Sequence, residues 1–309
     1  MFGSSDDVLV EDEFLRDGLQ NEARLLPLDD KLAFVRGLEA AGVRRIQLGS
    51  FVNPARVPQM ADTDALFSAV ERRPGVTYTA LVLNMAGLER ALAVAAPHLS
   101  ISVSASESHS RANVGKPVDE ALAHIAPVIG RALAAGVTVR AGIQSAFGCG
   151  FEGRVAPERV VAVAKTFDGL GVHEINLADT AGLGNPRQVH ELTGAVRAAV
   201  RRDVRLSLHL HDTRGLGLAN MVAGLQAGVR IFDAALGGLG GCPFIPAASG
   251  NIATEDAVFA LEEMGFATGI DWQALAALSR RLEGLLERRL PGRMARIAAP
   301  DVAPNLAKG

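Results

Sequence analysis

Short apolar segments alternate with longer amphipathic segments along the whole chain. The short segments are rich in Val, Ile and Leu, and we expect strands at residues 8–10, 45–48, 77–82, 99–104, 137–143, 174–178, 205–211 and 231–235. In the longer segments apolar residues recur at spacings of three and four, which is typical of helices that bury one side. We expect such helices at residues 30–41, 64–72, 119–135, 157–170 and 186–200.

This alternation predicts an α/β protein with a (β/α)8 TIM barrel fold, because strand–helix units of about 30 residues fill the chain. A doubly wound open sheet is the alternative, but its first strand would run into a glycine-rich phosphate loop. Here the first strand runs into Arg16-Asp-Gly-Leu-Gln20, which lacks that pattern. We expect one catalytic domain over residues 1–309, with the barrel at about 8–265 and an appended C-terminal helical cap at about 271–290.

Composition and charge narrow the class of protein. The 309 residues include 31 Lys and Arg against 34 Asp and Glu, a formal net charge of −3, and 49% are hydrophobic. A nucleic-acid-binding domain would carry a basic stripe, and a membrane span would need about 18 consecutive apolar residues. Two cysteines cannot form a disulfide framework, and the acidic N-terminus differs from a basic signal peptide. We therefore expect a cytoplasmic protein that binds neither nucleic acid nor membrane.

The seventh predicted strand carries two histidines on one face. Its sequence alternates leucine with Ser207, His209 and His211. Because side chains alternate between the two faces of a strand, the leucines would face the helices and the imidazoles the barrel mouth. Active sites of such barrels lie at the C-terminal ends of the strands. Two histidines spaced in this way suit a metal site, and two hydrogen-bonded core histidines are the alternative.

Asp17 and Asn251 are the candidate partners of these histidines. Asp17 directly follows the first strand and Asn251 follows the eighth, and both strands lie near the seventh in a closed barrel. Two imidazole nitrogens, a carboxylate oxygen and an amide oxygen suit octahedral Mg²⁺ or Mn²⁺ better than a closed tetrahedral zinc site. The alternative for Asp17 is a solvated carboxylate that caps the next helix.

The loop after the eighth strand, residues 237–251, is rich in glycine and carries Cys242. A glycine-hinged segment that holds one reactive group above a barrel mouth is typical of a lid. A glycine-rich turn with an inert thiol is the alternative.

Six motifs occur in order along the chain and together resemble the 3-hydroxy-3-methylglutaryl-CoA lyase family, within the metal-dependent TIM-barrel lyase and synthase superfamily. They are RDGLQNE at 16–22, SFVNP at 50–54, VPQMAD at 57–62, DTAG at 179–182, HLHDT at 209–213, and GLGGCP at 238–243 with SGN at 249–251. The match covers roughly residues 8–270. The cysteine loop separates the lyases from the related isopropylmalate-type synthases.

The resemblance implies a role for each matching residue. The implied divalent-metal ligands are Asp17, His209, His211 and Asn251. Implied catalytic residues are Arg16, which steadies the enolate, Cys242, which acts in proton transfer, and Asp179, an acid at the catalytic centre. Further polar residues expected at the substrate or just behind it are Gln20, Gln47, Ser50, Arg140 and Glu255. The resemblance also implies Mg²⁺ or Mn²⁺ as cofactor, a CoA thioester as substrate and a homodimer.

The implied reaction cleaves 3-hydroxy-3-methylglutaryl-CoA, or a similar 3-hydroxyacyl-CoA, to acetyl-CoA and a keto acid. The metal would hold substrate oxygens together, and Arg16 would face the developing negative charge. The chain departs from the family's pattern beside the expected substrate. Gln47 replaces a glutamate, Asp12 a longer acid, and Phe14-Leu15 small residues. The acyl group therefore stays open, with citramalyl-CoA or a longer-chain homologue as alternatives.

Other functions compete with this interpretation. A biotin-dependent carboxyltransferase or a Schiff-base aldolase needs a lysine inside the barrel. The lysines are expected on helices, a loop and the tail, and they are Lys31, Lys116, Lys165 and Lys308. An acetyl-CoA-condensing synthase uses similar groups in the reverse direction and stays open. A non-catalytic paralogue that binds acyl-CoA is the remaining alternative, favoured only by Gln47.

Overall fold

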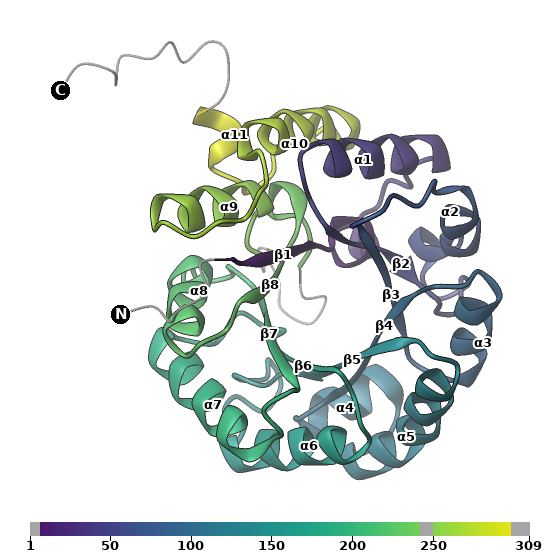
Figure 1. Cartoon of the computed structure of the whole chain (residues 1–309), viewed down its shortest axis with the longest axis vertical. Coiled ribbons are helices and arrows are strands. Elements are labelled where there is room, and N and C mark those ends of the chain that lie inside the picture. The colour runs from purple at the N-terminus through teal and green to yellow at the C-terminus, as the bar shows by residue number, and fades with distance from the viewer. Residues whose placement is uncertain (1–6, 242–249, 298–309) are drawn as a thin grey trace.

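The computed structural model describes residues 7–241 and 250–297. Eight parallel strands close into a barrel, in which the strands pair in chain order and β8 pairs with β1 (Figure 1). The strands are β1 Leu9–Asp12, β2 Arg45–Ser50, β3 Thr77–Val82, β4 His98–Ser104, β5 Thr138–Gln144, β6 Glu174–Asp179, β7 Arg205–Leu210 and β8 Ile231–Ala234. The predicted TIM barrel is confirmed, and each predicted strand overlaps an observed one.

Helices surround the barrel and cover the outer face of the sheet (Figure 1). They are α1 Leu28–Ala40, α2 Thr63–Ala69, α3 Met85–Ala93, α4 Glu107–Val114, α5 Val118–Ala134, α6 Pro157–Gly169, α7 Pro186–Ala199, α8 Gly217–Gln226, α9 Thr254–Glu263, α10 Trp272–Leu286 and α11 Met294–Ile297. The five predicted helices correspond to α1, α2, α5, α6 and α7. Among the described residues, no helix combines the length and apolar character needed to cross a membrane.

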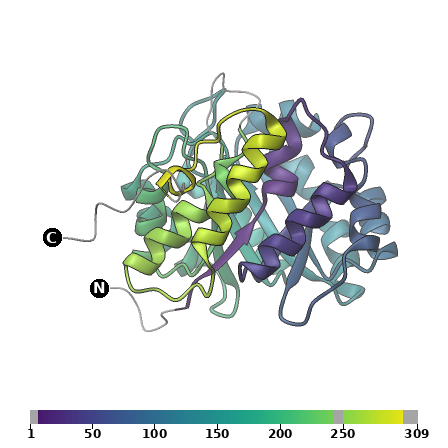
Figure 2. The ribbon, with the colours of Figure 1, turned by 90° about the horizontal axis from the view of Figure 1, so that it is seen from above.

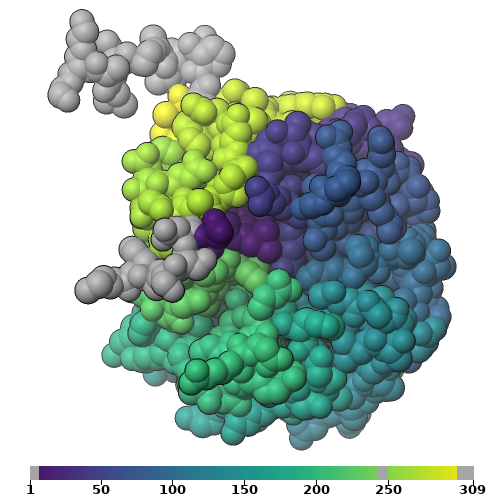
Figure 3. All heavy atoms as spheres, viewed as in Figure 1, coloured from purple at the N-terminus to yellow at the C-terminus, as the bar shows by residue number. Residues whose placement is uncertain are grey.

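The predicted C-terminal cap corresponds to α10, which lies beside α1 on the outside of the barrel (Figures 1 and 2). The two helices approach closely at Gly37, where an added Cβ would lie 2.7 Å from Cδ2 of Leu278. The space-filling view shows the same packing, with the C-terminal helices against the N-terminal part of the chain (Figure 3). Helices from the two ends of the chain therefore cover the junction where the barrel closes.

The barrel interior is ionic, whereas TIM barrels are usually filled by branched aliphatic side chains. At the start of the strands, Arg45 binds Glu174 through two hydrogen bonds of 3.0 and 2.9 Å, and its Nε lies 2.6 Å from a Glu11 oxygen. Further along the barrel, Arg140 donates to Glu11 at 2.9 Å and to Asp233 at 2.7 Å. All five side chains are buried. Ion pairs thus join strands across the interior, and each charge is compensated where burial alone would be costly.

Asp12 lies at the end of β1 and contacts the start of α9 outside the sheet. Its Oδ1 accepts a hydrogen bond from the Phe14 amide at 3.0 Å, and its Oδ2 accepts one from the Thr254 hydroxyl at 2.6 Å. Complete burial raises the pKa of Asp12 to about 7, against the opposing effect of these two hydrogen bonds. The carboxyl group therefore links β1 to α9 as a neutral acid at mildly acidic pH.

Replacing Asp12 by asparagine should change how stability depends on pH. The pKa of Asp12 is higher in the folded chain than in the unfolded chain. Its contribution to the free energy of unfolding is therefore fully present below about pH 4 and is lost as pH rises to about 7. The amide of the variant does not titrate. Between pH 5 and pH 8, the free energy of unfolding of the wild type should fall by about 2–3 kcal/mol relative to Asp12→Asn. Urea unfolding at both pH values measures this, and parallel profiles would contradict it.

Candidate active site

A cavity of about 560 Å³ opens at the carboxyl ends of the strands. Residues from the strands and from the loops that follow them line it, and α4 and α5 form one side. A volume of this size is within the range that small-molecule ligands occupy. The cavity therefore lies where TIM-barrel enzymes carry their active sites.

Asp17, His209 and His211 form a cluster at this cavity. The Nε2 atoms of the two histidines lie 3.0 Å apart, and Oδ2 of Asp17 lies 3.5 Å from the His211 nitrogen and 3.9 Å from the His209 nitrogen. Adjacent ligand atoms of an octahedral Mg²⁺, each about 2.1 Å from the ion, are about 3 Å apart. The separations in the cluster are close to this value, so the three side chains fit a shared divalent cation.

The strand alternation that the sequence predicts for β7 is present. Ser207 and His209 contact interior groups, and Leu208 packs against Gly224 of α8 on the outside. His211 follows the end of β7, where its backbone bridges to Asn251.

Asn251 lies beside the cluster. Its Nδ2 donates to Oδ2 of Asp17 at 2.8 Å and to the Leu239 carbonyl at 3.1 Å. Its Oδ1 is buried and has no hydrogen-bond partner within the described part of the chain. A buried carbonyl oxygen without a donor is unfavourable, and ligation of a cation would satisfy it. All four predicted ligand residues are therefore brought together, with one orphaned oxygen that a cation would explain.

The charge of the interior also suits a cation. Three carboxylates surround the His209 imidazole at the cavity, and they are Glu13, Asp17 and Asp233. This concentration of carboxylates favours a cation at the histidines.

The same carboxylates shift the pKa values of the cluster. Burial disfavours a charged His209, but hydrogen bonding to Asp233 and Glu13, with the charge of Asp17, outweighs it and raises the His209 pKa to about 10. Burial likewise disfavours an ionised Asp17, but Arg16 and the two histidines hold its pKa well below the usual range. Asp17 is therefore a carboxylate at all ordinary pH values.

A π-helical turn at Phe14–Gly18 presents Arg16 and Asp17 to the cavity. Three successive backbone amides, those of residues 16 to 18, point at the Glu13 carbonyl oxygen, at 3.1, 2.8 and 3.3 Å. Phe14 anchors the turn against Phe34 of α1, with ring centroids 5.2 Å apart. The bulky residue that departs from the family's pattern here is thus part of the hydrophobic core.

Arg16 is held from three sides. Its Nη1 donates to Oδ1 of Asp17 at 2.5 Å, its Nε donates to Gln47 and its Nη2 donates to Glu13. A guanidinium group has five N–H donors, so two remain for a ligand in the cavity. Arg16 is therefore a fixed cation next to the metal-binding cluster.

Of the other predicted site residues, Gln20 and Arg140 line the cavity, and Gln47 lies behind Arg16. Ser50 instead donates to the Leu81 carbonyl and lies between β2 and β3, away from the cavity lining. Cys242 lies outside the described residues, so its role stays a prediction.

Asp179 and Glu255 support loops near the site. Asp179 is buried and accepts hydrogen bonds from the amides of Leu183 and Gly184, and burial raises its pKa. Glu255 accepts from the Gly237 amide at 3.0 Å and from a hydroxyl of α10 at 2.8 Å, and burial raises its pKa to about 7. Neither is among the described residues that line the cavity. A direct catalytic role of Asp179 stays a prediction.

Glu13 and Asp233 are site residues that the sequence analysis missed. Both lie on the cavity wall, and each places a carboxylate oxygen 3.4 Å from Nδ1 of His209. Metal-binding histidines usually have such a carboxylate on the second ring nitrogen. Two features of the sequence could have identified them. Glu13 alternates with Glu11 at the end of the first apolar strand, and Asp233 is the single acidic residue within the eighth.

Comparison with known proteins matches the whole barrel. A model of the HMGL-like family matches residues 8–282. The (R)-citramalyl-CoA lyase of Chloroflexus aurantiacus is 43% identical over 294 residues, which cover 92% of this chain and 92% of that protein. The 3-hydroxy-3-isohexenylglutaryl-CoA/hydroxy-methylglutaryl-CoA lyase of Pseudomonas aeruginosa is 39% identical over 281 residues, 91% of this chain and 93% of that protein.

The fold comparison agrees. The structure of an HMG-CoA lyase from Acinetobacter baumannii, in complex with coenzyme A and 3-methylmalate, superimposes with a TM-score of 0.91 at 37% identity. The match covers 100% of this chain and 99% of that one.

Replacing His211 by alanine should weaken Mn²⁺ binding by about 100-fold or more. Loss of a residue that only hydrogen-bonds to a metal ligand already lowers metal affinity by about 10–100-fold. Isothermal titration calorimetry of the purified chain measures this. His190→Ala, on the exposed side of α7, is the matched control and should bind Mn²⁺ like the wild type. Equal affinities of wild type and His211→Ala would contradict the cluster's assignment as a metal site.

Proposed function

The chain belongs to the HMGL-like family, and on this premise we propose that it is a divalent-metal-dependent carbon–carbon lyase acting on 3-hydroxyacyl-CoA thioesters. The favoured substrate is 3-hydroxy-3-methylglutaryl-CoA or a close analogue, cleaved to acetyl-CoA and a keto acid. The observation that carries the proposal is the cluster of Asp17, His209 and His211 at the cavity, with Arg16 fixed beside it.

Asp17, His209, His211 and Asn251 would hold the cation. Bound Mg²⁺ or Mn²⁺ would act as a Lewis acid and as a template for the substrate's hydroxyl and carbonyl oxygens. The cluster would supply two imidazole nitrogens and a carboxylate oxygen, and Asn251 would add its amide oxygen. This set suits an octahedral ion that keeps positions open.

The remaining chemistry falls to groups of the chain. In retro-Claisen cleavage the hydroxyl proton passes to a base and the bond between C2 and C3 breaks. C3 becomes the carbonyl carbon of the keto acid, and the electron pair of the broken bond passes to the thioester as an enolate. Arg16 already lies in place, so its free N–H groups can stabilise the enolate oxygen without reorganisation. The enolate carbon then takes a proton, and the Cys242 thiol is the donor we expect there.

The acyl group has two candidates. The relative with 43% identity acts on citramalyl-CoA, and the one with 39% identity acts on 3-hydroxy-3-methylglutaryl-CoA and on an isohexenyl analogue, by their names. Both kinds of thioester carry the 3-hydroxyl group that the reaction requires. Citramalyl-CoA is therefore the second candidate substrate.

The lysine positions argue against two other reactions. Lys31 and Lys165 lie on α1 and α6, and Lys116 lies on the connection between α4 and α5, as predicted. None of these three side chains comes from a barrel strand, and of the three only Lys116 lines the cavity, from the connection between α4 and α5. Lys308 lies outside the described residues.

The cytoplasmic location and the homodimer expected from the sequence stay predictions. Light scattering of the purified chain in solution would test the second.

A panel of CoA thioesters tests the proposed function. We expect the Mg²⁺- or Mn²⁺-loaded chain to release acetyl-CoA and the matching keto acid from 3-hydroxy-3-methylglutaryl-CoA or citramalyl-CoA. Chromatography of the products measures this release. Condensation of acetyl-CoA with a 2-oxo acid, without any cleavage, would identify a synthase instead. Tight CoA-thioester binding without turnover would identify a non-catalytic paralogue.

Replacing Arg16 by glutamine should lower kcat by about 10²–10³-fold, because it removes a charged donor from the enolate. The change in KM should be much smaller, since the charge develops only during the reaction. Steady-state kinetics on the accepted thioester measure both. Arg187→Gln, an exposed change on α7, serves as the control and should keep wild-type kinetics. Equal losses in the two variants would show that the Arg16 effect is not local.

A further inference from the structure

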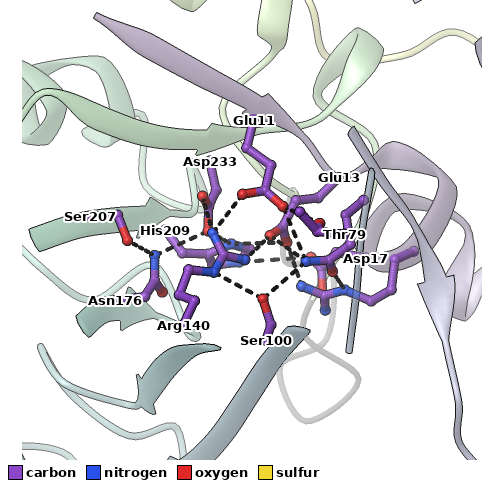
Figure 4. A network of polar contacts seen from close by, with 12 residues as sticks. Glu11, Glu13, Asp17, Thr79, Ser100, Arg140, Asn176, Ser207, His209 and Asp233 are labelled. Atoms are coloured by element: carbon purple, nitrogen blue, oxygen red, sulfur yellow. Dashed lines mark hydrogen bonds and ion pairs between the residues drawn. The ribbon is translucent and has the colours of Figure 1, made fainter. Parts of the chain in front are cut away.

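Glu13 is buried directly after β1, on the cavity wall, and four functional side chains meet at its carboxylate. Figure 4 shows two of them, Arg140 and His209, beside Glu13. Its Oε1 accepts hydrogen bonds from Nε2 of Gln47 at 3.0 Å and from Nη2 of Arg140 at 2.6 Å. Its Oε2 accepts one from Nη2 of Arg16 and lies 3.4 Å from Nδ1 of His209. Both oxygens are thus used, and each serves two neighbours.

The carboxylate separates two like charges. Arg16 and Arg140 each direct an Nη2 group at Glu13, one to each oxygen. Without the negative charge between them, the two guanidinium groups would repel each other in a buried setting, where such interactions are strong. Without Glu13, Arg140 would keep two carboxylates, Glu11 and Asp233. Arg16 would keep only Asp17, so its orientation would depend more on Glu13.

Gln47 is matched to Glu13. Its Oε1 accepts from Nε of Arg16, and its Nε2 donates to Glu13 and lies 3.4 Å from Oε1 of Glu11. A carboxylate at position 47 would place an oxygen against two other carboxylates, with no proton between them. An amide at 47 therefore suits an acid at 13, and the negative charge that the family's pattern puts at 47 stands at 13 in this chain.

We propose that Glu13 is a positioning residue for the cleavage reaction, which fixes the Arg16 guanidinium and the His209 imidazole in the orientations they present to the cavity. The proposal rests on the proposed function. Glu13 acts through its two neighbours. Arg16 determines how strongly the enolate charge is stabilised, and His209 determines how tightly the cation binds.

A charge-swap series tests the proposal. Kinetics and Mn²⁺ affinity are measured for the wild type, Glu13→Gln, Gln47→Glu and the double variant. Glu13→Gln should lower kcat by about 10–100-fold and weaken Mn²⁺ binding by about tenfold, the range found for outer partners of metal ligands. Gln47→Glu alone should also lower kcat, because it adds a carboxylate beside Glu13 and Glu11. The double variant returns one acid and one amide to the pair and should recover at least about tenfold in kcat over Glu13→Gln, while KM stays within about threefold throughout.

Rescue by the swap separates positioning from general damage to the fold. Glu174→Gln is the matched control, because it also neutralises a buried glutamate bound to an arginine, at the opposite end of the barrel. It should lower the denaturation midpoint and leave kcat within about twofold of the wild type. A Glu13→Gln variant with wild-type kcat, or a double variant no better than Glu13→Gln, would overturn the proposal.

Failure of the proposed function is distinguishable from failure of this inference. If the wild type cleaves none of the thioesters, the proposed function fails, and Mn²⁺ affinity alone then decides the role of Glu13. A tenfold weakening in Glu13→Gln, with unchanged affinity in Glu174→Gln, would still support it. Equal affinity of wild type and Glu13→Gln would overturn it.

Discussion

One buried guanidinium group holds together the strands that carry the active site. From β5, Arg140 reaches Glu11 and Glu13 on the β1 side, Asp233 on β8, and the Ser100 hydroxyl of β4 at 2.9 Å (Figure 4). A buried cation that loses one of its carboxylates is strongly destabilising, so these strands must meet in the observed register. Barrel closure between β8 and β1 and the assembly of the site are therefore the same structural requirement.

The ionic network has two ends with different tasks. At the start of the strands, Arg45 and Glu174 form a pair with two hydrogen bonds, and Arg45 also contacts Glu11. At the carboxyl ends, the network has more carboxylates than arginines, and the excess surrounds His209. Interior polarity thus serves to hold strands together at one end and to attract a cation at the other, which explains why aliphatic layers are missing between them.

Much of this arrangement could be predicted from the sequence, because it follows from the alternation of residues within strands and from the order of the strands along the chain. Strand alternation placed His209 on the inner face, and chain order placed Asp17 and Asn251 near it, since β1, β7 and β8 are neighbours in a closed barrel. The contacts of Glu13 could not be predicted in the same way. They depend on side-chain reach across the barrel, from β1 to Arg140 on β5, and neither periodicity nor motif spacing encodes that distance. The hydrogen bond of Ser50 to Leu81 could not be predicted for a related reason, because the sequence shows that Ser50 ends β2 but not which way its side chain turns.

The site joins groups from opposite ends of the chain, because Asp17 precedes α1 and Asn251 precedes α9, with β1 pairing to β8 between them. Contacts separated by most of the sequence form late, after the loop entropy of the intervening chain has been overcome. A chain that ends between residues 211 and 251 would hold Asp17 and both histidines but not Asn251. We therefore expect the full set of metal-binding side chains to assemble only once β8 and the segment that follows it have packed against β1.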